Sequence, residues 1–374
     1  MKYAIFSFLV LLSWQVSGQL NNTAFERATG IDPLDSGKLG FGVNTFGFNK
    51  NNEYFNKIAD GYTLFGYQVN PYLSYQPLPN VRFDVGIFLQ KDFGANGYQS
   101  IEPTYRFKYI KHDVQLIFGT LEGSISHRLV EPLYDFEKVL IDRLENGIQL
   151  KLEKEKLFAD LWVDWQKMIF KGDPDQEEVT GGLSLDYKIL DNEKLALSLP
   201  LQFVVYHKGG QIDDNPNPLQ TYVNTAVGAD LKLKLDGRLK ALRFSNYYLF
   251  YQDFSSERLL PFENGSGIYL NTTAETDFNV ELMLSYWKGH EFISIMGGQL
   301  YPSVSSTFKN PNHTEQEREL LIMRFFHELK LAKNLSLTSR FEPFYDLGNS
   351  KFEFSHGFYL NYNLDYTFKK GVSK

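Results

Sequence analysis

The strongest constraint in this sequence is a period-two alternation of apolar and polar residues, which returns in stretch after stretch between residues 39 and 368. In 64–76, for example, nearly every second residue is apolar or aromatic. Successive side chains of an extended strand point to opposite faces, so each stretch is predicted to be a β-strand with one apolar and one polar face. Many stretches run ten residues or more. They are longer than the usual strands of soluble sheets and match the roughly 9–11 residues that cross a bilayer.

The connections between these stretches alternate in length. Short links lie near 77–80, 110–113, 154–156, 190–193, 236–238, 288–289 and 333–334, and longer, mostly polar ones lie at 49–63, 91–98, 122–145, 170–179, 207–220, 253–266, 300–319 and 348–354. Eight long loops and seven short turns predict sixteen strands, with both chain ends on the short-turn side. This is the plan of bacterial outer-membrane barrels with periplasmic termini.

The strand number depends on reading 267–287 as one long strand and 290–299 as another. A turn at Thr276–Asp277 would add a strand, and some other assignment would then have to change. Counts of fourteen or eighteen strands remain open. The predicted fold class is therefore an all-β transmembrane antiparallel barrel of about sixteen strands.

The N-terminus has the features of a secretory signal peptide over residues 1–18. Lys2 gives a short positive start, Ile5 to Trp14 is largely apolar, and Val16 to Gly18 are small or apolar residues before the cleavage point. The apolar stretch is shorter than the roughly 20 residues that a membrane-spanning helix needs. Residues 19–38 are predicted to be a short periplasmic segment, 39–368 the barrel, and 369–374 a C-terminal tail.

Composition excludes several other classes of protein. The chain has 374 residues, of which 16% are aromatic and none is cysteine. Such aromatic content excludes disorder, and the lack of cysteine excludes a disulfide scaffold. With 38 basic and 45 acidic residues the net charge is -7, which argues against nucleic acid as a partner. The competing fold, a secreted β-sandwich, predicts shorter strands and does not need aromatic residues near strand ends, where barrels place their interfacial girdles.

The last strand carries a resemblance to a known class of protein. Gly357 is followed by alternating apolar residues that include Leu364, Tyr366 and a closing Phe368. This resembles the C-terminal assembly signal of Gram-negative outer-membrane barrels, although six residues follow the aromatic here. The resemblance implies a porin-like barrel in the cell outer membrane, with membrane lipid and the barrel-assembly machinery as partners. It leaves homo-oligomers open and names no subfamily.

The polar face of the barrel is predicted to enclose an aqueous channel, because sixteen strands leave more room than side chains fill. The charged residues that we expect on this face, as candidates for lining the pore, include Arg82, Asp84, Glu102, Arg106, Lys108, Asp160, Asp164, Arg324, Glu328, Arg340 and Glu342. Both signs are interspersed, so the charges either pair across the wall or form a selectivity track. We therefore expect passive diffusion of small hydrophilic solutes. The alternative is a barrel for surface polysaccharide assembly or binding without an open pore.

The loop 122–145 contains apolar residues at helical spacing. They include Leu133, Phe136, Leu140 and Leu144, in a segment that opens at Pro132 and ends before Gly147. The spacing predicts a short amphipathic helix. The helix either folds inward and narrows the pore or caps the rim of the barrel.

The residues give little support for an enzyme, a cofactor or a metal site, and we expect none of these. Ser126 and His127 are adjacent, so a strand would point them to opposite faces. His207 lies near Asp213 and Asp214 in one predicted loop, which is a weak coincidence. A run of four acidic residues could bind Ca²⁺ but lacks the spacing of a calcium-binding loop; its members are Asp173, Asp175, Glu177 and Glu178.

Overall fold

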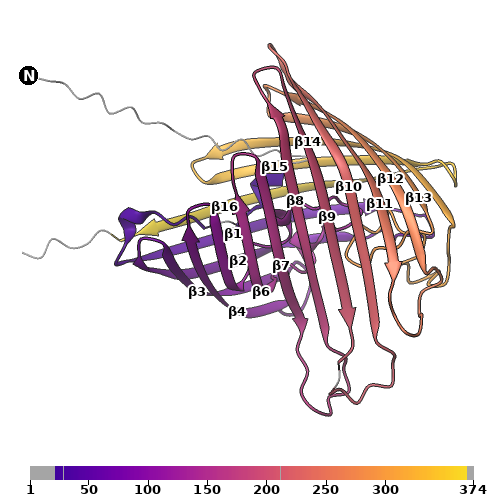
Figure 1. The fold of residues 1–374 in the computed structure, drawn as a ribbon, viewed down its shortest axis with the longest axis horizontal. Helices are drawn as coiled ribbons and strands as arrows, with labels where there is room; N and C mark the ends of the chain where they lie inside the picture. Colours follow the sequence, from indigo (N-terminus) through magenta and orange to yellow (C-terminus); the bar gives the residue numbers. More distant parts are fainter. Residues whose placement is uncertain (1–21, 28, 211, 369–374) are drawn as a thin grey trace, which may run out of the picture.

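Sixteen antiparallel strands close into one barrel in the computed structural model, which describes residues 22–27, 29–210 and 212–368 (Figure 1). Each strand pairs with its neighbours in the sequence, and β1 closes the barrel by pairing with β16. The strands are β1 (Lys38–Glu53), β2 (Thr63–Leu78), β3 (Val81–Asp92), β4 (Ser100–Lys111), β5 (Val114–Thr120), β6 (Asn146–Glu153), β7 (Leu157–Lys167), β8 (Glu178–Asp191), β9 (Leu195–Lys208), β10 (Gln220–Lys234), β11 (Leu239–Asp253), β12 (Asn264–Thr276), β13 (Val280–His290), β14 (Glu317–Ala332), β15 (Leu335–Asp346) and β16 (Lys351–Thr367).

The predicted barrel of sixteen strands is therefore confirmed. The predicted signal peptide 1–18 and the C-terminal tail 369–374 lie outside the described residues. Among the helices that the described ranges contain, none has the length and apolar character needed to cross a membrane.

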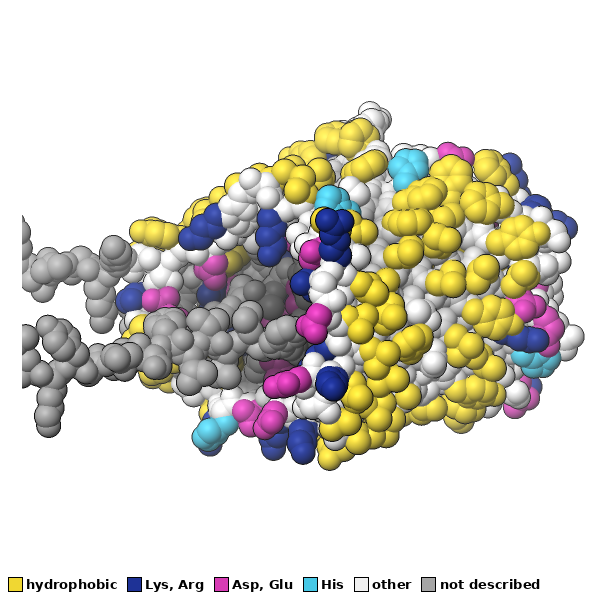
Figure 2. Space-filling view, turned by 90° about the horizontal axis from the view of Figure 1, so that it is seen from above, with side chains coloured by type: hydrophobic (Ala, Val, Ile, Leu, Met, Phe, Trp, Pro, Cys, Tyr) yellow, Lys and Arg dark blue, Asp and Glu magenta, His cyan; other side chains and the backbone are white. Residues whose placement is uncertain are grey.

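The alternation in the sequence becomes an inside and an outside. In β1 the even-numbered residues from Gly40 to Asn52 are buried and face the lumen, while the odd-numbered ones remain partly exposed. Large exposed apolar side chains recur around the wall, for example Leu73, Phe118 and Leu284. Figure 2 shows hydrophobic side chains spread over the outer wall, with charged groups gathered toward its ends. A surface of this kind is stable against lipid and would aggregate in water.

The connections follow the predicted division into two ends, except that the predicted short link 288–289 lies inside β13 and the short turn is at 277–279 instead. The seven short turns lie at the end where β1 starts and β16 finishes, and the two longest loops, 121–145 and 291–316, lie at the other end. Short turns use residues that tolerate the left-handed backbone region, such as Asn334 with φ 64° and Gly237 with φ 103°. The placement of the short-turn end in the periplasm stays a prediction.

Two strand predictions are wrong, and their errors cancel in the count. The segment 267–287 is not one strand, because 277–279 forms a turn between β12 and β13, with Asn279 at φ 56°. The segment 290–299 is not a strand, because it belongs almost wholly to the loop 291–316. There Phe292 and Ile293 are consecutive and both buried, which a strand with a lipid face and a lumen face would not allow.

The lumen is filled by a hydrophobic core. The loops 121–145 and 291–316 and the N-terminal segment 22–37 all contribute buried residues to one cluster with inward-facing aromatic residues of the wall. Phe25 illustrates the packing, since its ring centre lies 5.1 Å from that of Phe136 and 5.2 Å from that of Tyr359. The helical pieces in these segments are short: η1 (Asn22–Phe25), η2 (Pro33–Asp35), η3 (Ser124–His127) and α1 (Lys138–Ile141).

Candidate functional site

The charged residues predicted for the lumen are on its inner face by strand alternation. Eight are buried, namely Arg82, Asp84, Lys108, Asp160, Asp164, Arg324, Arg340 and Glu342, whereas Arg106 and Glu328 are half-buried and Glu102 is exposed. Many of the buried ones pair with a neighbour in the wall, as Arg82 does with Asp84 at 2.7 Å and Arg340 with Glu342 at 2.6 Å. These pairs hold the wall together. Their part in a path for ions stays a prediction.

Other wall charges hold the loop 121–145 inside the barrel. Arg324 on β14 contacts Glu131 of the loop at 2.5 Å and Glu342 on β15 at 3.0 Å. Lys50 on β1 contacts Glu137 of the loop at 2.6 Å. Buried ion pairs of this kind fix geometry, because removing one partner leaves an uncompensated charge in a dry environment.

The apolar residues of the predicted constriction helix fold inward. Leu133, Phe136 and Leu140 are buried in the luminal core, and Leu144 is half-buried. The helix itself is shorter than predicted, since α1 covers only Lys138–Ile141. Packing against the wall, rather than helical hydrogen bonding, holds this segment in place.

His127 in η3 is fully buried between two carboxylates. Its Nδ1 lies 2.9 Å from Asp160 Oδ2, and its Nε2 lies 2.7 Å from Glu145 Oε2. Its ring also stacks on Trp162, with ring centres 4.2 Å apart. Burial alone would lower the pKa of His127, but the two carboxylates outweigh burial and raise the pKa to about 9. Because both ring nitrogens are engaged, His127 is a structural cation and does not serve its neighbour Ser126 as a base.

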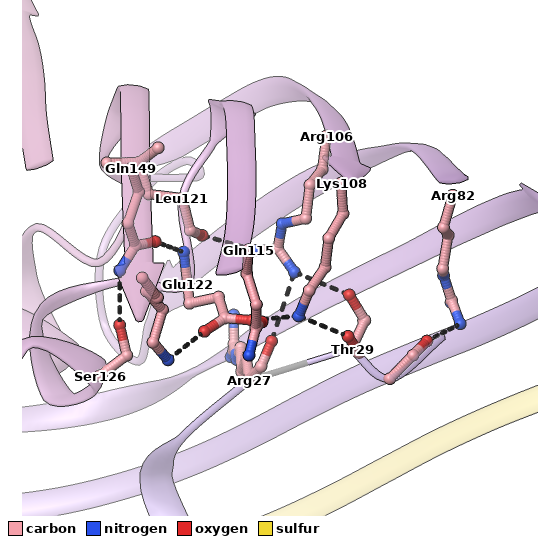
Figure 3. Close-up of polar contacts among 12 residues, drawn as sticks. Arg27, Thr29, Arg82, Arg106, Lys108, Gln115, Leu121, Glu122, Ser126 and Gln149 are labelled. Atoms are coloured by element: carbon pink, nitrogen blue, oxygen red, sulfur yellow. Dashed lines mark hydrogen bonds and ion pairs between the residues drawn. The ribbon is translucent and has the colours of Figure 1, made fainter. Parts of the chain in front are cut away.

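A cleft lined by both polar and apolar residues lies in the lumen among the N-terminal segment, strands β1 to β5 and the loop 121–145. It encloses about 650 Å³, part of it open to solvent, and is lined by residues that include Arg27, Arg106 and Arg143. Figure 3 shows the contacts at one side of this cleft, where Lys108 reaches the backbone oxygen of Thr29 at 2.9 Å and Glu122 at 2.7 Å.

Glu122 is the junction of this network. Besides Lys108 it contacts Lys151 at 2.8 Å, so two lysines share one carboxylate. Burial would raise the pKa of Glu122, but Lys151 and Lys108 outweigh burial and hold it far below its usual range. The negative charge of Glu122 is therefore balanced by the positive charges of Lys108 and Lys151.

A second polar cluster lies on the outside of the barrel, where the wall faces lipid. Asn51 and Glu53 on β1, Thr63 on β2 and His356 on β16 share this face near the long-loop end, and we call them the outer polar cluster. Asn51 stands directly opposite Thr63 on one side and opposite His356 on the other. Paired side chains of this kind have Cβ atoms about 4.5–5.5 Å apart.

Hydrogen bonds organise the outer polar cluster. Thr63 donates from Oγ1 to Asn51 Oδ1 at 2.7 Å, and Asn51 donates from Nδ2 to Glu53 Oε1 at 2.5 Å. The ring of His356 lies between those of Phe354 and Phe358, each 6.3 Å away. The sequence prediction missed this cluster. Its signal was present, however, as polar residues standing at the lipid-facing positions of three strands.

The remaining sequence candidates do not form sites. His207 contacts Thr221 and the backbone oxygen of Gly209, while Asp213 accepts from the backbone of Gly210 instead. In the acidic run, Asp175 pairs with Lys167 at 2.9 Å and Glu178 pairs with Lys208 at 2.7 Å. Across the described ranges, no group of three or more acidic or histidine side chains is placed to hold a metal ion.

The residues of the predicted assembly signal are in and just after β16. Leu364, Tyr366 and Phe368 face outward, and the last two rings contact each other at 5.7 Å. Gly357 faces inward where a Cβ atom would come within 2.3 Å of the Tyr359 hydroxyl, so only glycine fits. Recognition by the assembly machinery stays a prediction.

A closed barrel of sixteen strands with an apolar outer wall defines the class: this is a porin-like outer-membrane β-barrel of a Gram-negative bacterium. A family described as "Lipid A 3'-O-deacylase-type" matches residues 31–371, so the chain belongs to this family. None of the curated proteins matches the sequence.

Solved structures agree on the fold. The outer membrane protein OprD of Pseudomonas aeruginosa is 11% identical, with a TM-score of 0.51 over 91% of this chain and 99% of that one. A loop-deletion mutant of OmpT from Vibrio cholerae is 11% identical, with a TM-score of 0.52 over 88% of this chain and all of that one. At such identity these likenesses establish the architecture of the barrel.

The family membership corrects one expectation from the sequence. We expected no enzyme, and the family is named for one. The expectation failed because it considered only histidines with a serine or an acid nearby in the chain. Closure of the barrel instead brings β16 beside β1, so His356 meets Asn51 across 305 positions of sequence.

Proposed function

We propose that this protein is an outer-membrane ester hydrolase that removes an ester-linked acyl chain from a lipid A-type glycolipid, at the outer polar cluster. The description of its family supports the reaction class. The observation that carries the choice of site is the hydrogen-bonded group of Asn51, Glu53 and Thr63, with His356 directly opposite Asn51, on a wall that faces lipid. An acyl chain in the membrane can reach this wall without entering the barrel.

The filled lumen also favours a site on the outer wall. Three segments pack a continuous apolar core inside the barrel, and residues such as Leu133 and Leu140 have no exposed surface. A glycolipid with several acyl chains would have to displace this core to enter. On the outside, exposed rings such as Phe341, the cross-strand partner of His356, and Phe358 offer an apolar surface next to His356.

The chemistry assigned to the cluster is hydrolysis of an ester. His356 acts as general base and takes a proton from a water molecule, whose oxygen attacks the ester carbonyl carbon. The bond from that carbon to the sugar oxygen then breaks, and the sugar oxygen recovers the proton from the imidazole. The products are a fatty acid and a free sugar hydroxyl.

Asn51 is suited to stabilise the oxyanion that forms in this step. Its amide has two N–H donors, one of which is bound by Glu53 while the other stays available. Because Thr63 fixes the amide oxygen and Glu53 fixes the amide nitrogen, the orientation of Asn51 is set before substrate arrives. Donors that are oriented in advance are the most effective electrostatic catalysts.

The test is incubation of the purified protein with lipid A in mixed micelles, with mass spectrometry of the glycolipid. We expect loss of one acyl chain, and we expect His356→Ala to slow the reaction by about 10²-fold or more, because it removes the general base. His290→Ala is the matched control, because His290 also faces outward and contacts a carboxylate, Glu317, at 2.6 Å. Full activity of His356→Ala, or an intact glycolipid with the unaltered protein, would refute the proposal.

Diffusion of small hydrophilic solutes is a second candidate function. The porin-like fold and the cleft of about 650 Å³ favour it, and the packed lumen disfavours an open pore. Thr120 and Asn146 are cross-strand partners, so deletion of 128–145 leaves a link long enough to join β5 and β6. In planar bilayers this deletion should raise the single-channel conductance if the loop narrows a pore; unchanged conductance would discard that constricting role, and the lack of any conductance in both proteins would discard the channel. The polysaccharide-assembly alternative stays a prediction.

A further inference from the structure

Three arginines line the luminal cleft, and the described residues provide none of them with a carboxylate partner. Arg27 comes from the N-terminal segment, Arg106 from β4 and Arg143 from the loop 121–145, and all three line the cleft. None of them takes part in an ion pair among the described residues, whereas Arg82 and Arg324 in the same lumen each contact two carboxylates.

The hydrogen bonds of these arginines go to neutral groups. Arg106 donates to the backbone oxygens of Thr120 at 2.8 Å and Leu121 at 2.5 Å. Arg143 donates to the backbone oxygen of Phe25 at 2.6 Å. These bonds position the guanidinium groups but leave their charge uncompensated.

Arg27 is the least engaged of the three. Its described hydrogen bond is one from Nη2 to the side-chain oxygen of Gln68, at 3.3 Å. Burial and the nearby charges of Arg143 and Arg106 lower the pKa of Arg27 well below its usual value. A guanidinium does not lose its proton in proteins, so an anion bound in the cleft would relieve this repulsion.

The carboxylates that line the cleft cannot supply this anion. Asp84 is bound by Arg82 at 2.7 Å, and Glu122 is shared by Lys108 and Lys151. The cleft therefore carries a surplus of positive charge in about 650 Å³ of space, part of it open to solvent.

We infer that the cleft binds a phosphate-type oxyanion, held by the guanidinium groups of Arg27, Arg106 and Arg143. Planar guanidinium groups match the oxygens of phosphate through paired N–H donors. This site is inside the barrel and is separate from the outer polar cluster, so it stands independently of the proposed hydrolase. A bound anion would also fasten the N-terminal segment, through Arg27, to the wall and the loop.

The test is isothermal titration calorimetry of inorganic phosphate into the full-length purified protein in micelles, at constant ionic strength. We expect saturable binding to one site and at least tenfold weaker binding to Arg27→Gln. Arg238→Gln is the matched control and should bind like the unaltered protein, because Arg238 is exposed in the turn between β10 and β11.

Folding of each variant is checked by heat-modifiable migration on unboiled gels. Arg27→Lys is a second variant, for use if Arg27→Gln does not fold. It keeps the positive charge but loses the planar guanidinium group with its paired N–H donors, so it should weaken phosphate binding by severalfold. A phosphate-dependent rise in the unfolding temperature of the unaltered protein, absent with chloride, gives a measurement that needs no variant.

A parallel titration with vesicles that contain a phosphorylated glycolipid distinguishes the source of the oxyanion. If the protein binds the vesicles but not inorganic phosphate, and this binding depends on Arg27, the oxyanion is a lipid headgroup. If the protein binds inorganic phosphate and this binding depends on Arg27, the oxyanion is a free anion. Either result supports the site. The inference is overturned if the unaltered protein binds neither probe, or if Arg27→Gln binds both as tightly as the unaltered protein.

Discussion

His127 is expected to make the stability of the barrel depend on pH. Its pKa is raised to about 9 by Glu145 and Asp160, which outweigh burial, against about 6.5 in an unfolded chain. A group with a raised pKa in the folded state contributes stability that is complete below its unfolded pKa and disappears as the pH rises through its folded pKa. At about 1.4 kcal/mol per pKa unit, the contribution of His127 is about 3 kcal/mol at pH 6 and is largely gone at pH 10.

The perturbation that tests this reasoning is His127→Asn. At pH 6 it should lower the free energy of unfolding by about 3–5 kcal/mol, because it leaves two buried carboxylates without a cation. At pH 10 the difference from the unaltered protein should be much smaller, because its own imidazole is then neutral. Unfolding in urea is followed at both pH values by tryptophan fluorescence, and Trp162 reports locally because its ring stacks on His127.

His290→Asn is the control for this experiment. His290 also contacts a carboxylate but is exposed at the rim, so its replacement should change the free energy of unfolding by less than about 1 kcal/mol at either pH. The reasoning fails if His127→Asn is equally destabilising at pH 6 and pH 10. It also fails if the stability of the unaltered protein does not fall between these values.

Three further outcomes are expected from the same unfolding assay. Leu284→Arg places a charge on the lipid-facing wall and should cost about 2–4 kcal/mol if Leu284 lies near the bilayer midplane; a neutral result would contradict the assignment of faces. Leu140→Ala removes a fully buried side chain and should cost about 2–5 kcal/mol, with faster proteolysis of the loop 121–145; a loop that resists proteolysis as before would argue against its packing in the core. Arg324→Met removes the cation that Glu131 contacts and leaves Glu342 with Arg340 alone; it should cost about 3–5 kcal/mol, and most of the loss should be recovered at low pH, where carboxylates are protonated.

The sequence by itself determined the barrel. Alternation with period two depends only on the geometry of an extended chain, and the contrast between long and short connections depends only on which end of the barrel a link joins. Both are local properties, so they can be read without knowing which strands meet. The strand prediction from local pattern was wrong at 267–299. There the alternation of apolar and polar residues continues through a three-residue turn, 277–279, that contains neither proline nor glycine.

Only the tertiary structure decided what fills the lumen and where the polar groups meet. The alternation predicted an inner polar face, but it could not show that 121–145, 291–316 and the N-terminal segment would pack inside that face. Likewise, the sequence shows His356 only as a residue of the last strand with aromatic neighbours. Closure of the barrel is what places it opposite Asn51. Contacts between residues far apart in sequence carry no local signal, because they arise from the closure of the sheet and the folding of loops into it.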